Sequence, residues 1–207
     1  MLAGLGIGRA TSRLVADPEE AAALVADDER AMVVKIVSPD LPHKSDVGGV
    51  RVGVRGADAV RAAATEILAS VVRLAPSAVV EGLLVEEMAP SGIELVCGLH
   101  RDPVLGPVVT VGLGGLLVEV IGEVQHCKAP LTMDHARVAV EELAGGRLTS
   151  HHRGLSPAAV EQVADLLVRL GDLAVACPEV TEVDLNPVIV GPGELAVVDA
   201  LVVCEAC

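Results

Sequence analysis

The stretch VKIVSPDLPHKSDVGGV, Val34 to Val50, predicts a buried strand, a polar loop and the start of a second strand. The strand at Ala31–Val37 is apolar apart from one lysine, which is typical of a strand inside a sheet. Proline and glycine interrupt the polar segment that follows, as expected for a loop. We therefore expect Lys35 to lie within a sheet, and His43 and Lys44 to lie in the adjoining loop.

A lysine at the centre of an apolar strand must reach solvent or meet a negative group, because an unpaired buried charge is costly. For Lys35, a bound phosphate and a structural carboxylate are both possible partners. The loop adds Lys44, His43 and the pair Gly48-Gly49, and lysines with glycine-exposed amide groups could cradle a phosphate. The P-loop pattern GxxxxGK[ST] does not occur in the sequence.

His43 has two interpretations. It is either an ordinary solvated loop residue or, beside cations and a phosphate, a general base or phosphoryl acceptor. The loop sequence alone does not decide between them.

Apolar periodicity and turn residues divide the rest of the chain into helices and short strands. The run Asp17-Pro18-Glu19-Glu20 is a strong helix start, and Asp58 is predicted to cap a second helix. Helices are expected near 17–28, 58–71, 133–143 and 157–176. Strands are expected near 31–37, 50–54, 79–88, 93–100, 107–111, 116–120, 182–190 and 194–203. Hairpins as well as helices join adjacent strands, which favours an α+β fold with substantial antiparallel sheet.

The last hairpin predicts a metal site. If Val190 pairs with Leu195 across a four-residue turn, Asn186 lies opposite Asp199 on the same face, with β-carbons about 5 Å apart. A carboxylate beside a carboxamide suits Mg²⁺, which prefers oxygen ligands and often takes the rest from substrate phosphates. Pro187 cannot donate to the sheet, so a bulge or an edge is expected there. The alternative is a polar pair that faces solvent.

A group of acids lies where one predicted strand ends and the next begins. Glu86, Glu87 and Met88 close the first strand, and Glu94 opens the second. Such acids could accept hydrogen bonds from an adenine amino group or from ribose hydroxyls, while Met88 offers an apolar contact. Plain surface charge is the alternative.

Composition excludes several classes of protein. The chain has 207 residues, of which 52% are hydrophobic and none is aromatic, and its formal charge is −14. Its high hydrophobicity excludes disorder, and the absence of basic and aromatic surfaces argues against nucleic-acid binding. No apolar stretch approaches the roughly 20 residues of a membrane span, and the first residues lack a secretion signal. We expect a cytoplasmic protein that does not bind membranes.

Together these segments resemble one family. The Val34–Val50 stretch is very similar to the signature of the ATP-grasp domain of ADP-forming acyl-CoA synthetases, which are related to the β subunit of succinyl-CoA synthetase. The similarity continues in order along nearly the whole chain. Its further segments are Gly92–Leu95, Arg101–Pro103, Gly106–Val109, Gly112–Gly115, Glu182–Pro187 and Val198-Asp199.

The resemblance implies a fold and a reaction. It implies one ATP-grasp domain over 1–207, with a smaller lid-like subdomain near 17–84 and a larger one near 85–207. The family reaction is acyl-CoA + ADP + phosphate ⇌ carboxylic acid + CoA + ATP, through an acyl phosphate and phosphohistidine. It also implies a CoA-binding α-type partner subunit that carries the first phosphohistidine, and hence a hetero-oligomer.

The resemblance also assigns roles to residues. It places Lys35 at the nucleotide phosphates, Glu86, Glu87 and Met88 at the adenine-binding hinge, and Glu94 at the ribose of ATP or ADP. Asn186 and Asp199 match the Mg²⁺ ligands. His43 matches a second phosphoryl carrier, and Lys44 lies beside it among the expected catalytic residues.

The sequence departs from the family at two places. The segment before Gly6 is short, and Lys128 in the run Cys127–Leu131 stands where relatives often carry arginine, which binds phosphate bidentately as lysine cannot. Lys128 is kept as a candidate nucleotide contact. These departures leave a non-catalytic regulatory or scaffolding ATP-grasp module as the alternative function. An ATP-grasp carboxylate–amine ligase is less favoured, because the Ser38–Gly49 signature belongs to the CoA branch.

Overall fold

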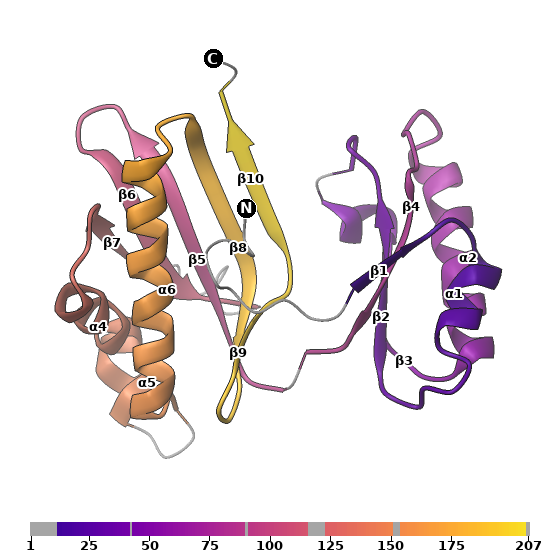
Figure 1. Cartoon of the computed structure of the whole chain (residues 1–207), viewed down its shortest axis with the longest axis horizontal. Coiled ribbons are helices and arrows are strands. Elements are labelled where there is room, and N and C mark those ends of the chain that lie inside the picture. The colour runs from indigo at the N-terminus through magenta and orange to yellow at the C-terminus, as the bar shows by residue number, and fades with distance from the viewer. Residues whose placement is uncertain (1–11, 42, 90, 116–122, 151–153, 206–207) are drawn as a thin grey trace. The chain divides into compact units, whose positions relative to one another are not determined.

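The computed structural model describes residues 12–41, 43–89, 91–115, 123–150 and 154–205 (Figure 1). The chain divides into two compact units, of which one runs to Met88 and the other begins at Ala89. Each unit is an antiparallel sheet with helices packed on it. The interpretation of 17–84 as a lid-like subdomain stays a prediction.

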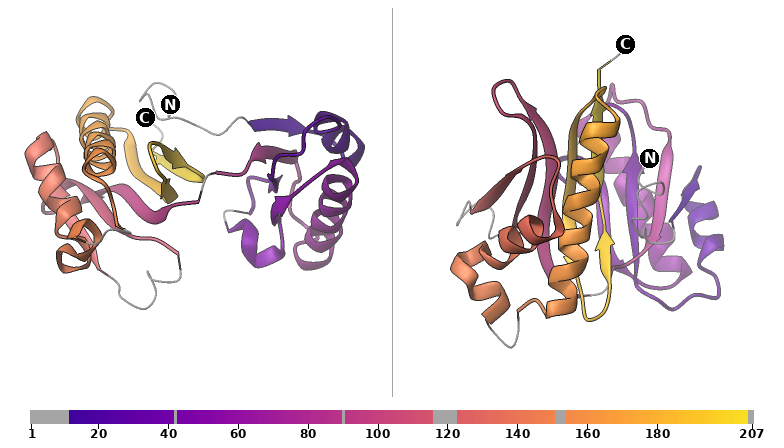
Figure 2. Two further views of the ribbon diagram at one scale, coloured as in Figure 1. Left: turned by 90° about the horizontal axis from the view of Figure 1, so that it is seen from below. Right: turned by 60° about the vertical axis from the view of Figure 1, so that its left-hand side comes forward.

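The first unit is built on a four-stranded sheet in the order β1-β4-β2-β3, in which all neighbours are antiparallel. Figures 1 and 2 show α1 and α2 lying on the same side of this sheet. Its elements are β1 (Ser12–Val15), α1 (Pro18–Leu24), β2 (Met32–Val37), the 3₁₀ helix η2 (Lys44–Val47), β3 (Val50–Val54), α2 (Ala57–Leu74) and β4 (Gly82–Glu87).

Both helices of this unit begin near the predicted positions, with two corrections. Asp17 caps α1 by accepting from the Glu20 amide, as expected, but the helix ends at Leu24 and not near residue 28. Asp58 is not the N-cap of α2, because Gly56 holds that position. Asp58 lies in the first turn, where its charge still favours the positive end of the helix dipole.

The second unit has a six-stranded antiparallel sheet in the order β10-β8-β5-β6-β7, with β9 also paired to β8. Its strands are β5 (Ile93–Asp102), β6 (Gly106–Leu113), β7 (Val124–Lys128), β8 (Val180–Val190), β9 (Leu195–Val197) and β10 (Ala200–Cys204). Its helices are α4 (Met133–Glu141), the 3₁₀ helix η3 (Leu143–Gly146), α5 (Arg147–Ser150) and α6 (Pro157–Ala176).

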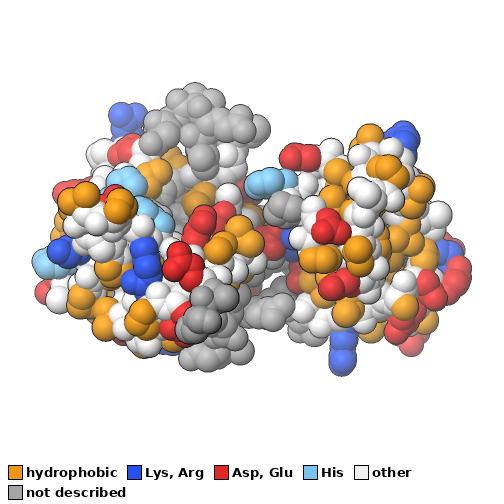
Figure 3. All heavy atoms as spheres, turned by 90° about the horizontal axis from the view of Figure 1, so that it is seen from above, with side chains coloured by type: hydrophobic (Ala, Val, Ile, Leu, Met, Phe, Trp, Pro, Cys, Tyr) orange, Lys and Arg blue, Asp and Glu red, His pale blue; other side chains and the backbone are white. Residues whose placement is uncertain are grey.

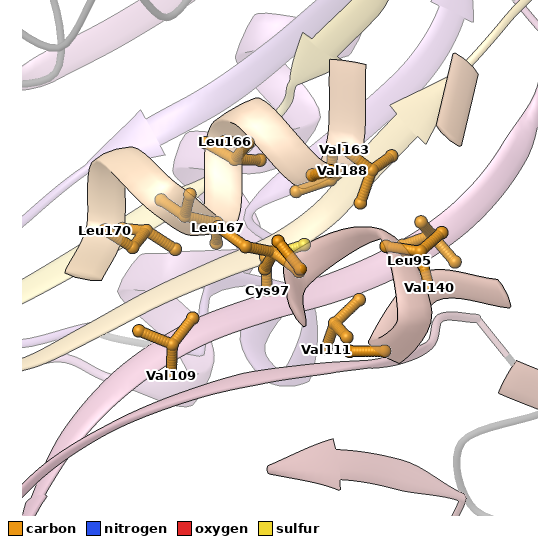
Figure 4. Close-up of a cluster of buried hydrophobic side chains, with 14 of the residues drawn as sticks. Leu95, Cys97, Val109, Val111, Val140, Val163, Leu166, Leu167, Leu170 and Val188 are labelled. Carbon is orange, nitrogen blue, oxygen red and sulfur yellow. The ribbon is translucent and has the colours of Figure 1, made fainter. Parts of the chain in front are cut away.

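Among the described residues, the fully buried core of this unit consists of Ala, Val and Leu side chains and Cys97, as the lack of aromatics requires. Figure 4 shows residues of α6 facing the sheet, with Leu167 beside the buried Cys97. Because Leu185 and Val188 of β8 are fully buried in the same cluster, this sheet face is the covered one.

Five short elements were not predicted from the sequence. They are four or five residues long: β1, β7, the helix α5 and the 3₁₀ helices η2 and η3. The strand predicted at 116–120 lies outside the described residues.

Strand β8 contains a bulge at Asn186-Pro187. Against β5, Leu95 pairs with Val188 while Cys97 pairs with Leu185, so two residues of β8 face Val96 alone. An extra residue of this kind bends a strand and leaves backbone groups unpaired on one side. The expectation that Pro187 marks a bulge is thus confirmed.

Acidic and apolar side chains are both exposed on the face drawn in Figure 3. In the face drawn in Figure 3, acids occur on both units and hydrophobic atoms form separate groups among them. Within the described ranges, no helix has the length and apolar character that crossing a bilayer would need.

Candidate functional site

The terminal hairpin adopts the predicted register. Val190 pairs with Leu195 across the turn, and the same register resumes where Ala200 pairs with Leu185. Between these pairs, the Asn186 amide donates to the Asp199 carbonyl at 3.2 Å. Asn186 and Asp199 are therefore direct cross-strand neighbours, which share a face of the sheet.

This face is opposite to the one covered by helices. Leu185 is fully buried in the core, whereas its neighbour Asn186 is exposed and Asp199 is partly exposed. The second strand is interrupted at Asp199, between β9 and β10, and Asp199 Oδ1 accepts from the Ala200 amide at 3.0 Å. The bulge in β8 thus lies opposite the gap between β9 and β10, with Asn186 in the bulge and Asp199 in the gap.

Asn186 and Asp199 offer oxygen donors that fit a hard cation. In the described part of the chain, no three His, Cys, Asp or Glu side chains gather into a metal site. An Asn–Asp pair alone is too small a ligand set for a protein-enclosed ion. It does suit Mg²⁺, which commonly binds through one or two protein ligands, with water and substrate phosphates completing the shell.

Glu94, on the neighbouring strand β5, is held against a glycine turn. Its carbonyl accepts from the Gly114 amide at 2.7 Å. A Cβ added at Gly115, where φ is +66°, would lie 2.8 Å from Glu94 Oε2. Glycine at this turn therefore lets the backbone pass directly beside an exposed carboxylate.

In the first unit, Lys35 meets a carboxylate. Lys35 Nζ lies 2.7 Å from Glu86 Oε2, and the two side chains are only 8% and 10% exposed. Both residues project from the sheet face opposite Val34 and Val85, which belong to the core. Of the two partners considered for Lys35, the structure contains the carboxylate, and that carboxylate belongs to the predicted adenine-hinge segment.

The two residues after Glu86 are tied to the loop before β2. Glu87 forms an ion pair with Arg30, and the Met88 amide donates to the Ala31 carbonyl at 2.8 Å. Arg30 also binds Asp28, and this hydrogen bond lowers the pKa of the Asp28 carboxyl to about 2. The Met88 side chain is 47% exposed, so it can offer the expected apolar contact.

His43 and Lys44 lie at the start of η2. His43 is exposed and is the N-cap residue of this 3₁₀ helix, while Lys44 is half-buried. The helix closes at Gly48, whose φ is +65°, and the Gly49 amide donates to the Lys44 carbonyl at 2.8 Å. The predicted loop therefore ends in an ordered turn beside β2.

Lys128 is the last residue of β7, the strand at the far edge of the six-stranded sheet, and it is exposed. Strands β5 and β6 separate it from Asn186 on β8. The structure does not bring Lys128 together with the Asn186–Asp199 pair.

Sequence reasoning missed the residues that hold these side chains in place. Arg30 binds Glu87, and Ser70 and Arg51 bind the carbonyls that follow Lys44. Each is polar and lies outside the signature stretch or at its end. The contacts of Arg30 and Ser70 span 57 and 23 residues of sequence, so no local pattern could have indicated them, whereas Arg51 binds a carbonyl only three residues away.

Two antiparallel sheets with one-sided helix layers, a lysine-bearing strand and an Asn–Asp pair are typical of an ATP-grasp nucleotide-binding domain. A family model for the ATP-grasp domain matches residues 1–204, and the chain belongs to this family. The predicted α+β class and ATP-grasp fold are confirmed.

Particular relatives narrow the comparison. The chain is 41% identical over 199 residues to an acetate–CoA ligase [ADP-forming] I of Archaeoglobus fulgidus, covering 96% of this chain and 29% of that protein. It is 34% identical to the β subunit of acetate–CoA ligase [ADP-forming] I of Pyrococcus furiosus, covering 91% of this chain and 81% of that subunit. The chain thus spans less than a third of the first relative and most of the second.

Solved structures of an acetyl-coenzyme A synthetase have the same fold as this chain. A dinucleotide-forming acetyl-coenzyme A synthetase 1 of Ca. Korarchaeum cryptofilum, in complex with coenzyme A and Ca-AMPCP, matches with a TM-score of 0.91 and 42% identity. That match covers 99% of this chain and 89% of the other. A second structure of that enzyme contains Mg-AMPPCP and a phosphohistidine segment that points towards the nucleotide-binding site, with a TM-score of 0.81, 39% identity and coverage of 99% and 88%.

Proposed function

We propose that this chain is the nucleotide-binding part of an ADP-forming acyl-CoA synthetase. Its task is to move a phosphoryl group between a phosphohistidine and ADP or ATP in the presence of Mg²⁺. The observation that carries the proposal is the direct pairing of Asn186 with Asp199 on the helix-free face of the sheet. The 34% identity to a β subunit of such an enzyme supports it.

Asn186 and Asp199 would hold the magnesium ion. Their oxygens supply part of an octahedral shell and leave positions for water and for nucleotide phosphates. When bound, the ion neutralises charge on the transferring phosphoryl group. Mg-AMPPCP in the Korarchaeum relative supports this choice of ion and ligand.

The first unit would supply contacts to the nucleotide. Lys35 would reach the phosphates, and Glu86 holds its ammonium group in place at 2.7 Å. Glu87 and Met88 would line the adenine hinge. Two residues of the second unit would also take part, because Glu94 of β5 would bind the ribose and Lys128 of β7 would add positive charge. In this scheme the Lys35–Glu86 pair preorganises one cation in a site that must bind a polyanion.

His43 would act as the phosphoryl carrier near the nucleotide. In the ATP-consuming direction, a ring nitrogen lone pair attacks the γ-phosphorus, and the bond to the β–γ bridging oxygen breaks. A P–N bond replaces a P–O bond, and ADP leaves with the electron pair. Lys44, the next residue, would stabilise the charge on the moving group.

The proposed enzyme needs a second component. A CoA-binding α-type subunit would carry the first phosphohistidine and complete a hetero-oligomer. The name of the P. furiosus relative, a β subunit, supports such a partner. Because the reaction would interconvert acyl-CoA and ADP with CoA and ATP, we place it in the cytoplasm.

Titration with Mg-ATP and Mg-ADP by calorimetry tests the proposal. Asp199→Asn removes one anionic ligand and should weaken Mg-nucleotide binding on the order of tenfold or more. Asp165→Asn on α6 is the matched control, since it removes the same charge from a surface ion pair with Arg169. A wild-type chain that binds no nucleotide, or equal affinities for all three proteins, would overturn the proposal.

Labelling with γ-labelled ATP separates the enzyme from a regulatory or scaffolding module. A non-catalytic module could bind nucleotide but would not label His43 from γ-labelled ATP. The relatives named as ligases favour the enzyme. Labelling that persists unchanged in His43→Ala would remove His43 from the reaction.

A further inference from the structure

We propose that Ser70, near the C-terminal end of α2, is a positioning residue for His43. This inference rests on the function proposed above and adds to it a residue outside the signature stretch. The hydroxyl of Ser70 donates to the Val47 carbonyl at 2.9 Å, across 23 residues of sequence. Val47 is the last residue of η2, the helix that begins directly after His43.

The partner of this hydroxyl is unusual for its place. A serine inside a helix commonly bonds to the carbonyl one turn earlier in its own helix. Thr65 of α2 does so, because its hydroxyl donates to the Arg61 carbonyl at 2.8 Å. The Ser70 hydroxyl instead donates to a carbonyl of the loop. Because Ser70 is only 9% exposed, this hydrogen bond is shielded from water.

The backbone approaches Ser70 closely at this point. A Cβ added at Gly48 would lie 2.8 Å from Ser70 Oγ, so only glycine leaves room for the contact. Arg51 binds the next carbonyl, that of Gly48, at 3.0 Å, and the Ile36 amide binds the carbonyl of Gly49 at 2.8 Å. The three consecutive carbonyls of Val47, Gly48 and Gly49, at the end of η2, are thereby fixed to α2, β3 and β2.

The loop is also fixed before His43. Asp40 Oδ2 accepts from the Val79 amide at 2.7 Å, and Leu41 is buried in the core of the unit. His43 is exposed between these two attachments. A carrier that must meet a phosphoryl donor in line gains from such a restrained backbone, because misplacement by about 1 Å can cost a hundredfold in rate.

Phosphoryl transfer separates a positioning role from a merely structural one. In Ser70→Ala, the affinity for Mg-ATP should stay within about twofold of wild type, since no proposed nucleotide contact is removed. The rate of His43 labelling from γ-labelled ATP should fall about tenfold, the equivalent of one lost buried hydrogen bond. Thr65→Ala, on the same helix, should leave both values unchanged.

Hydrogen exchange tests the attachment without any transfer. The amides of Gly48 and Gly49, which close η2, should exchange about tenfold faster in Ser70→Ala and at the wild-type rate in Thr65→Ala. Unchanged exchange, or unchanged labelling in a wild type that does label, would overturn the role of Ser70. A wild type that binds no nucleotide would instead overturn the proposed function and leave the exchange result to decide on Ser70.

Discussion

Removal of the Glu86 carboxylate is the sharpest test of the buried ion pair between β2 and β4. Lys35 Nζ and Glu86 Oε2 are 2.7 Å apart, and both side chains are at most 10% exposed. Breaking a buried pair by removing one partner costs about 3–5 kcal/mol of unfolding free energy. We expect about 3 kcal/mol for Glu86→Leu, since the flexible stem of lysine can carry its charge part of the way to water.

Two further variants show whether charge is the cause. Glu86→Gln keeps an oxygen acceptor for Lys35 and should cost only about 1–2 kcal/mol. The double variant Lys35→Met/Glu86→Leu should recover most of the loss, because apolar replacement of a buried pair is often nearly neutral. Glu87→Gln is the neighbouring control: it weakens a pair whose arginine is 63% exposed and should cost less than about 1 kcal/mol.

Urea denaturation followed by far-UV circular dichroism measures these differences. Intrinsic fluorescence is of no use, because the chain contains no Trp, Tyr or Phe. The reasoning is refuted if Glu86→Leu is within about 1 kcal/mol of wild type, or if the double variant is no more stable than Glu86→Leu.

Three other expectations concern the scaffold. Arg101 donates to the carbonyls of Ala174, Cys177 and Val180, where α6 ends. Because lysine cannot make these three contacts together, Arg101→Lys should lower the unfolding free energy by about 1–3 kcal/mol in the same urea assay. A loss below about 0.5 kcal/mol would contradict this expectation. Gly49→Ala would place a Cβ 2.6 Å from Ile36 Cγ2 and should also lower the unfolding free energy by about 1–3 kcal/mol. An unfolding free energy equal to that of wild type would instead show that Ile36 can shift without loss of packing. Burial raises the pKa of the Cys97 thiol to about 12 from an ordinary value near 9, so at pH 8 a disulfide reagent should label exposed Cys204 quickly and Cys97 only after unfolding. Rapid labelling of Cys97 in the folded chain would refute its burial. Because the pKa of Cys97 is higher in the folded chain than in the unfolded chain, the stability contributed by the neutral thiol is complete below pH 9 and is lost as the pH rises from 9 to 12.

The sequence predicts most of the fold because local signals and packing agree. Apolar spacing and turn residues placed α6 at its observed bounds and β3 at Val50–Val54. Strands β1 and β7 were missed because polar side chains make up half or more of each, so neither forms an apolar run. Asp58 was misplaced as a cap because an acid in the first turn is favoured on the same electrostatic grounds.

In the candidate site, contacts set by a nearby turn were predicted from the sequence, and contacts between distant residues were not. Antiparallel register is fixed by one turn, so the pairing of Asn186 with Asp199 followed from the loop length at Gly191–Glu194. The partner of Lys35 could only be narrowed to a phosphate or a carboxylate, since Glu86 is distant in sequence. Ser70 gave no signal, because a serine inside a helix is ordinary until its partner is known.

The bulge in β8 gives one strand two different alternation phases. Before it, the odd-numbered Val183 and Leu185 face the helices; after it, the even-numbered Val188 and Val190 do so. Deleting one of the two bulge residues would therefore leave both halves facing the core, now in one regular alternation. What would be lost is the extra residue that sets Asn186 opposite Asp199, so the number of residues in this stretch matters to the candidate site more than to the core.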